Sequence, residues 1–111
     1  MSGHKAQKLN FVDEVIKPGV KRADWHGGPF TAVRYTYEPG AVFPSHSHEA
    51  AQITIVLAGQ IKFSVDNVEF SLDSGESIYI PGNVSHGAEV PSESEPVVSI
   101  NIFHPPRKEH P

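Results

Sequence analysis

Short strand-like runs separated by turn residues recur from Phe30 to Phe103, and this rhythm restricts the fold more than any other feature of the chain. The runs are rich in Val, Ile, Phe and Tyr, which favour strands. Glycine, proline, asparagine and aspartate interrupt them, as is typical of tight turns. No segment has the long 3.6-residue period of an amphipathic helix. The sequence therefore predicts an all-β domain.

The strand predictions follow the alternation of apolar and polar residues. Ile61–Val65 and Val68–Leu72 flank the pair Asp66-Asn67, which predicts a hairpin because Asn tolerates a left-handed backbone. The other predicted strands are Phe30–Tyr37, Ala51–Leu57, Ser77–Ile80, Ser85–Val90 and Val97–Phe103. Antiparallel strands of this number must close into a barrel or stack as a sandwich to protect their edges.

The length of 111 residues fits one domain. We divide it into an N-terminal extension at 1–29, the β-domain at 30–104 and a proline-rich C-terminal tail at 105–111. The extension is expected to add one strand, at Leu9–Val15 or at Val20–Asp24. A strand of this kind can pair with the sheet edge of a partner, so a homodimer is the expected assembly.

The composition excludes several classes of function. Thirteen acidic and nine basic residues give a net charge of −4, and no basic cluster is interleaved with aromatics, which argues against nucleic-acid binding. No run of about twenty apolar residues could form a membrane span. The N-terminal residues lack the apolar run of a secretory signal, so a cytoplasmic location is expected. The chain has no cysteine, which excludes disulfides and thiolate ligands.

The histidines predict a metal site. His46 and His48 alternate in an extended segment and would face the same way, and Gln52 has the same parity. A third histidine, His86, follows the turn at Pro81-Gly82-Asn83. Three imidazoles and an amide oxygen that converge form a plausible donor set for one metal ion. The remaining histidines are interpreted as surface residues that bind no ligand: His4, His26, His104 and His110.

This donor set indicates which metals and which chemistry to expect. Neutral imidazole and oxygen donors suit one divalent transition metal, namely Ni, Fe, Mn, Co or Zn. With no more than four protein ligands, the metal keeps coordination positions open for substrate, as in catalytic sites and in contrast to structural ones. Because an amide is neutral, Gln52 leaves the ion close to its full +2 charge and favours Lewis-acid chemistry.

Two segments resemble the motifs of the cupin superfamily. The first motif, G-x5-H-x-H-x3,4-E-x6-G, is matched with all spacings kept by Gly40, His46, His48, Gln52 in place of the glutamate, and Gly59. The second, G-x5-P-x-G-x2-H-x3-N, is matched by Gly75, Pro81, Asn83 in place of the glycine, and His86, with Val90 at the final position. The resemblance implies a single-domain jelly-roll β-barrel of six to eight strands that holds a metal through His46, His48, Gln52 and His86.

The C-terminal segment is similar to that of a narrower group. Asn101, Phe103, Pro105 and Arg107 follow the ending D-x-F-x-P-x-R of the small cupins of pectin and alginate breakdown, which open 4,5-unsaturated uronates to the linear ketone. By this resemblance Arg107 would hold the substrate carboxylate, Phe103 would wall the pocket, and Asn101 would occupy the acid/base position. The planar fork of arginine suits bidentate binding of a carboxylate.

Asn101 departs from the aspartate of that group, because an amide cannot exchange a proton near neutral pH. Proton transfer would then depend on the metal site or on another group, for which the candidates are Tyr35, Tyr79, His104 and Glu89. The first hypothesis is a metal-dependent enzyme acting on a small carboxylated sugar, so the expected partner is a small acidic molecule. The alternatives are a non-catalytic sugar- or acid-binding cupin, such as a sensor, and an iron-dependent oxygenase of a small organic acid.

Overall fold

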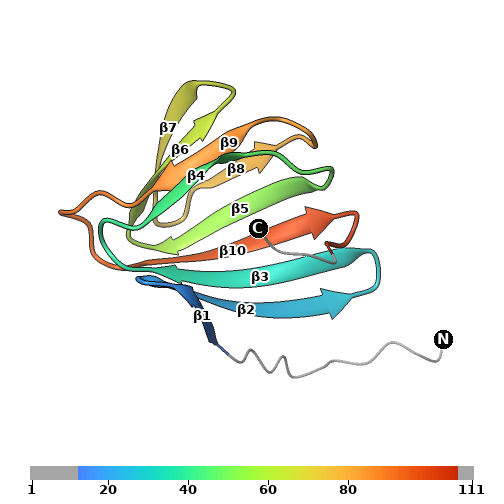
Figure 1. The fold of residues 1–111 in the computed structure, drawn as a ribbon, viewed down its shortest axis with the longest axis horizontal. Helices are drawn as coiled ribbons and strands as arrows, with labels where there is room; N and C mark the ends of the chain where they lie inside the picture. Colours follow the sequence, from blue (N-terminus) through green and yellow to red (C-terminus); the bar gives the residue numbers. More distant parts are fainter. Residues whose placement is uncertain (1–12, 108–111) are drawn as a thin grey trace.

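The structure is a computed structural model that describes residues 13–107, and these residues form ten strands and no helix (Figure 1). The strands are β1 Glu14–Lys17, β2 Val20–Gly27, β3 Phe30–Tyr37, β4 Val42–His46, β5 Ala51–Ala58, β6 Gln60–Val65, β7 Val68–Asp73, β8 Ser77–Ile80, β9 His86–Glu89 and β10 Val97–His104. Among these residues there is no helix long and apolar enough to cross a membrane.

The strands form two antiparallel sheets. The larger has the order β1-β2-β3-β10-β5-β8, and the smaller has the order β4-β9-β6-β7. In Figure 1 the strands β2, β3, β10 and β5 follow one another in a single layer. The all-β jelly-roll prediction is confirmed. The seven strands predicted from alternation agree with the observed ones to within one residue at either end.

The core forms where the two sheets face each other. On β3 the residues Thr31, Val33, Tyr35 and Tyr37 are buried, and the residues between them are more exposed, as expected for a strand with one face on the core. The rings of Tyr35 and Tyr37 stack at 5.4 Å, and Phe43 of β4 meets both edge-on. These three aromatic rings pack against one another in the interior and also line the cavity of the candidate site.

The N-terminal strands extend the larger sheet of their own chain. β2 pairs with β3 along its whole length, from Val20↔Tyr37 to Gly27↔Phe30, and β1 pairs with β2. The strand predicted at Val20–Asp24 is thus the first part of β2. The alternative at Leu9–Val15 lies mostly outside the described residues. Its last two residues, Glu14 and Val15, belong to β1. These two strands bring the total to ten, above the six to eight that the cupin resemblance implied.

Candidate metal centre

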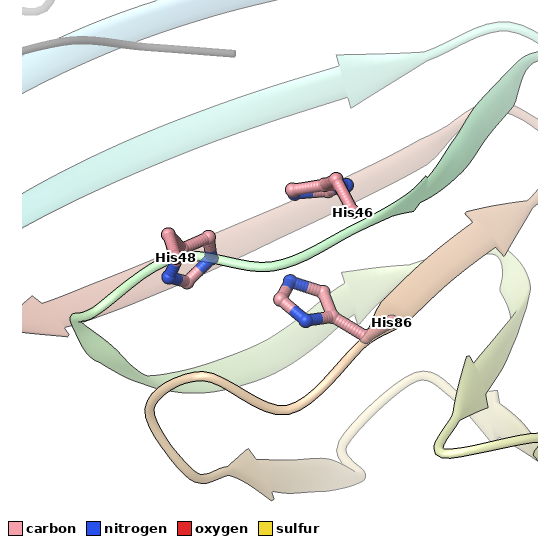
Figure 2. A group of neighbouring side chains, drawn as sticks. All are labelled: His46, His48 and His86. Atoms are coloured by element: carbon pink, nitrogen blue, oxygen red, sulfur yellow. The ribbon is translucent and has the colours of Figure 1, made fainter.

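Three imidazoles converge where the ends of two strands meet. His46 ends β4, His86 begins β9, and the two residues are register partners across the β4–β9 pair. His48 lies in the coil just after β4 (Figure 2). One ring nitrogen from each of the three histidines lies within 4.8 Å of the corresponding atoms of the other two. The fold therefore places side chains from two distant segments around one point.

The convergence does not arise from strand parity. The extended segment predicted to carry both histidines ends at His46, and a bend at Glu49–Ala50 separates His48 from β5, where Gln52 is the second residue. The turn between β8 and β9 holds the intervening loop, because the N–H of Asn83 donates to the carbonyl of His48 at 2.7 Å. A backbone contact between two turns thus fixes the position of the middle imidazole.

All three rings are held by the same kind of hydrogen bond. In each histidine Nδ1 lies within hydrogen-bond distance of the carbonyl oxygen of a residue two positions away, and since a carbonyl only accepts, Nδ1 must carry the proton. The pairs are His46 with Pro44 at 3.0 Å, His48 with Ala50 at 2.8 Å, and His86 with Val84 at 2.9 Å. This leaves Nε2 as the lone-pair nitrogen, and in His48 that atom is buried without a partner among the described residues. Backbone carbonyls orient metal-binding histidines in the same manner.

Burial keeps two of these imidazoles neutral. Desolvation, assisted by the nearby positive charge of Arg107, lowers the pKa of His48 to about 4. Burial likewise lowers the pKa of His86. Both rings are therefore unprotonated at neutral pH, which is the form that binds a metal. The donor set fits a divalent transition metal, since it offers three imidazole nitrogens within 4.8 Å of one another and no thiolate.

Gln52 lies beside this group. Its side chain is buried on β5 and lines the same cavity as His46 and His86. Its amide nitrogen donates to the hydroxyl of Thr54 at 2.8 Å, so the amide oxygen remains the atom available to a ligand or ion. The structure thus brings the fourth predicted donor to the site, and its bond to a metal stays a prediction.

The three residues of the C-terminal segment line the cavity next to the imidazoles. The ring of Phe103 meets His48 edge-on at 5.6 Å, and the guanidinium of Arg107 lies over the ring of Phe103 at 5.1 Å from its centroid. The backbone N–H of Arg107 donates to the hydroxyl of Thr31 and anchors the start of the tail. Asn101 is almost fully buried, and its side-chain oxygen has no hydrogen-bond partner among the described residues.

Comparison with known families decides the classification. The Cupin domain family matches residues 33–103, which include all four predicted metal ligands. The chain belongs to the cupin family.

This cupin is similar to several characterised or solved proteins. It is 31% identical over 101 residues to the H2HPP isomerase of Bacillus subtilis, a match that covers 82% of this chain but 42% of that protein, so the chain spans about two fifths of this relative. The structure of KdgF from a Halomonas species matches with a TM-score of 0.81 and 26% identity, covering 92% of this chain and 97% of that one. An RmlC-like cupin from Shewanella frigidimarina matches with a TM-score of 0.82 and 30% identity, covering 96% and 95%.

The fold of this cupin separates the four candidate groups for proton transfer. Only Tyr35 of the four lines the cavity; Tyr79, His104 and Glu89 are exposed. Burial raises the pKa of Tyr35, while the nearby guanidinium of Arg22 partly offsets the rise, so the phenol stays protonated and polarised at neutral pH.

Several residues that line the cavity were not predicted from the sequence: Tyr37, Phe43 and Phe63. Arg22, which does not line the cavity but interacts with Tyr35, was not predicted either; it is the register partner of Tyr35 on β2, a relation that needs the β2–β3 pairing to be known. Of the histidines predicted to bind nothing, His26 and His104 lie outside the cluster, bonded to Thr31 and to the carbonyl of Pro29, and His4 and His110 lie outside the described residues.

Proposed function

We propose that this cupin is a metal-dependent enzyme that acts on a small carboxylated sugar, with 4,5-unsaturated uronates as the specific substrate class and ring opening to the linear ketone as the reaction. The observation that carries the proposal is the arrangement of one cavity. His46 and His86 line this cavity, and His48 lies beside them in the group of three imidazoles. The guanidinium of Arg107, which also lines the cavity, lies close enough to lower the pKa of His48. A metal site and an anchor for a carboxylate therefore face the same space.

Arg107 is suited to bind the carboxylate of the substrate. Its guanidinium lies over Phe103, and among the described residues no acidic side chain forms an ion pair with it. Burial lowers the pKa of Arg107, yet arginine remains charged at all ordinary pH values. A partly desolvated guanidinium without an internal counter-ion favours an anionic ligand, and a bidentate pair would also fix the orientation of that ligand.

His46, His48, Gln52 and His86 would hold the metal. When bound, the divalent ion would supply Lewis-acid chemistry and lower the pKa of a substrate hydroxyl that coordinates to it. Ni, Fe, Mn, Co and Zn remain the candidate ions, because imidazole and amide donors accept all of them.

The ring opening needs one proton to leave and one to be delivered. The hydroxyl at C1 loses its proton, and the bond from C1 to the ring oxygen breaks, which forms an aldehyde at C1 and leaves the electron pair on the former ring oxygen as an enolate. The enolate then takes up one proton at C4 to give the ketone. Tyr35 is placed to deliver that proton, since it lines the cavity as a protonated phenol next to Arg22. The proton from the hydroxyl passes to solvent, from which Tyr35 is reprotonated, so the reaction is an isomerisation with no net gain or loss of protons.

A direct assay tests the activity. Metal-loaded protein is incubated with a 4,5-unsaturated uronate, and the loss of enol-ether absorbance is followed. We expect acceleration over buffer that depends on the metal and that falls by about a hundredfold or more in Tyr35→Phe. Tyr37→Phe is the matched control, because Tyr37 stacks on Tyr35 and lines the same cavity. No acceleration with any of the candidate metals would rule the activity out.

A second function, non-catalytic binding of a sugar acid, is favoured by Asn101. Its buried side-chain oxygen has no partner, so it can accept a hydrogen bond from a ligand hydroxyl, but it cannot transfer a proton. The substitution Asn101→Asp separates the two functions. Activity that appears only in the aspartate variant identifies the natural protein as a binder; activity already present in the wild type identifies an enzyme.

We also propose the setting that the sequence predicts: a cytoplasmic protein that acts as a homodimer on a small acidic molecule, without nucleic acid or membrane partners. The acidic balance of the chain, with a net charge of −4, supports the last point.

A further inference from the structure

A row of polar side chains runs across the inner face of the six-stranded sheet. Register pairs connect Glu14 of β1 to Arg22 of β2, and Arg22 to Tyr35 of β3. Tyr35 in turn pairs with Ser99 of β10. Side chains directly opposite each other on neighbouring strands lie on the same face of a sheet. The row therefore crosses four neighbouring strands of the larger sheet (Figure 1), and it reaches the cavity at Tyr35.

The row leads from solvent into the interior. The side chain of Glu14 is 72% exposed and that of Arg22 only 13%, whereas Tyr35 and Ser99 are buried. The next row on the same face has no charged member and is buried throughout: Val20, Tyr37 and Val97. Taking a guanidinium out of water is costly unless other groups pair with it. The place of Arg22 on this face therefore calls for a specific reason.

Two carboxylates hold the guanidinium of Arg22. Its Nη2 lies 3.6 Å from Oε1 of Glu14, and its Nε lies 3.5 Å from Oδ1 of Asp24. A guanidinium carries five N–H donors, so these two ion pairs leave others available. One of them donates to the phenol oxygen of Tyr35. Arg22 thus connects two acidic side chains with the residue that the proposed reaction uses as its acid.

This hydrogen bond determines what the phenol can do. A guanidinium cannot accept a hydrogen bond, so the oxygen of Tyr35 accepts from Arg22, and its own O–H proton is left for another partner. Tyr35 lines the cavity, whereas Arg22 does not. A ligand in the cavity can therefore receive the phenol proton while Arg22 stays bonded to the oxygen from outside.

A second cation, Arg107, also acts on the phenol, and it lines the cavity itself. In the proposed function Arg107 pairs with the substrate carboxylate, which offsets its charge. Asp24 is the anion that acts on the phenol. The other side chains around Tyr35 come from β3, β4 and β10: Tyr37 stacked on its ring, Phe43 edge-on, Ser99 as register partner, and His46 at the same cavity. Once substrate occupies Arg107, Arg22 is the cation that remains for the phenol oxygen.

We propose that Arg22 is a positioning residue for Tyr35: it holds the phenol oxygen as an acceptor, leaves the O–H proton to the ligand, and stabilises the phenolate that remains after proton transfer. The inference rests on the proposed function. In that reaction the O–H bond of Tyr35 breaks, its proton forms the new C–H bond at C4, and the oxygen keeps the electron pair until solvent returns a proton. A hydrogen bond to an ionised acceptor is about twice as strong as a neutral one. Arg22 therefore contributes more as the proton leaves, which lowers the barrier.

Steady-state kinetics of the metal-loaded protein test this role. Arg22→Gln should lower kcat for a 4,5-unsaturated uronate about a hundredfold, because it removes a donor to the developing charge. It should change KM less than twofold, since Arg22 does not line the cavity. Arg34→Gln is the matched control, because Arg34 is adjacent to Tyr35 on β3, faces the other side of the sheet and pairs with Asp13 at 3.0 Å. A raised KM with unchanged kcat in Arg22→Gln would overturn the proposal, because Arg22 would then bind substrate directly.

A titration that needs no substrate tests the contact itself. Tyrosine is replaced throughout the chain by 3,5-difluorotyrosine, whose phenol ionises at lower pH, and fluorine NMR follows the three labels as the pH is raised. Single Tyr→Phe substitutions assign the three signals. The pKa of the label at position 35 should rise in Arg22→Gln, because the ionised oxygen loses its donor, and should keep the parental value in Arg34→Gln. Equal values in the two variants would overturn the proposal.

Arg22→Lys covers the case in which a neutral residue beside Glu14 and Asp24 prevents folding. Lysine keeps the charge but lacks the planar fork that pairs with two carboxylates and the phenol at once. We expect kcat to fall about tenfold and the pKa of the label at position 35 to rise above the parental value. A folded lysine variant that equals the parent in both measurements would overturn the proposal.

The two readouts separate this inference from the proposed reaction. If no metal-loaded preparation converts the uronate but the label responds to the loss of Arg22, the reaction is wrong and the contact between Arg22 and Tyr35 stands. If the uronate is converted and neither kcat nor the label responds, the reaction stands and the role of Arg22 is wrong.

Discussion

Gly82 is the point where the two halves of the metal site touch, and its substitution by alanine gives the sharpest test of how the site is built. A Cβ atom at this position would lie 2.2 Å from the carbonyl oxygen of Glu49. Next to it, the N–H of Asn83 donates to the carbonyl of His48 at 2.7 Å. The turn that precedes His86 therefore packs directly on the backbone that carries His48.

The size of the effect follows from these distances. Ordinary contact begins near 3.4 Å, so the alanine methyl must push the two segments apart by about 1.2 Å. Backbone atoms on both sides leave no flexible side chain to yield. Overpacking of this kind costs about 1 to 3 kcal/mol, and losing the hydrogen bond to His48 adds about 1 kcal/mol. Metal–ligand distances tolerate only about 0.2 Å, so we expect metal binding to weaken by about ten- to a hundredfold.

The assay is competition for the metal against a chromophoric chelator, together with thermal unfolding of the metal-free protein. Gly75→Ala is the matched control: its φ of +90° strains an alanine, but nothing lies within 4 Å of the added methyl and the turn is remote from the histidines. We expect Gly75→Ala to lose stability and keep its metal affinity. If Gly82→Ala binds metal within twofold of the wild type, the contact between the two turns does not position His48.

Three further outcomes are expected. His86→Ala should lose its metal on dialysis, because it removes one of three imidazole donors, and elemental analysis should show unchanged occupancy in His26→Ala. Arg107→Ala should raise KM for an acidic substrate more than for its neutral amide, and equal changes would refute the anchoring role. The free energy of unfolding of the metal-free protein should fall as pH drops from 6.5 to about 4, because the unfolded chain binds a proton at His48 that the folded chain refuses. Urea titrations should show a shallower fall in His48→Asn.

Alternation was enough to predict most strands because each strand has one face on the core. On β3 and β10 every second residue is buried, and on β6 Ile61 and Phe63 are buried, as their pattern predicts. The pairing of β2 with β3 could not be derived in the same way. The polar residues Arg22 and Asp24 of this strand are only 13% and 25% exposed and form an ion pair with each other, so polarity does not mark its outer face.

The site was predicted from residue types and spacing, but not from its geometry. Parity within one strand suggested that His46, His48 and Gln52 align, whereas a bend and a contact between two turns bring them together. The orientation of the rings depends on backbone carbonyls, which carry no sequence signal. Asn83 is an exception: it takes the place of a motif glycine, and its φ of +65° shows why a residue that tolerates the left-handed region is needed there.

The strands β5 and β10 carry chemically different residues on their two faces. Inward, these strands present Gln52, Asn101 and Phe103 to the cavity; outward, they present isoleucines to solvent. A buried polar side chain that binds a ligand needs a rigid backbone. If its polar atom moves, it loses the hydrogen bond to the ligand, and no water can take the place of that bond. Asn101, with its unpartnered oxygen, is such a residue. Asn101 lies on β10, which pairs with β3 on one side and with β5 on the other, so the sheet of this chain itself holds the backbone of Asn101 in a fixed position.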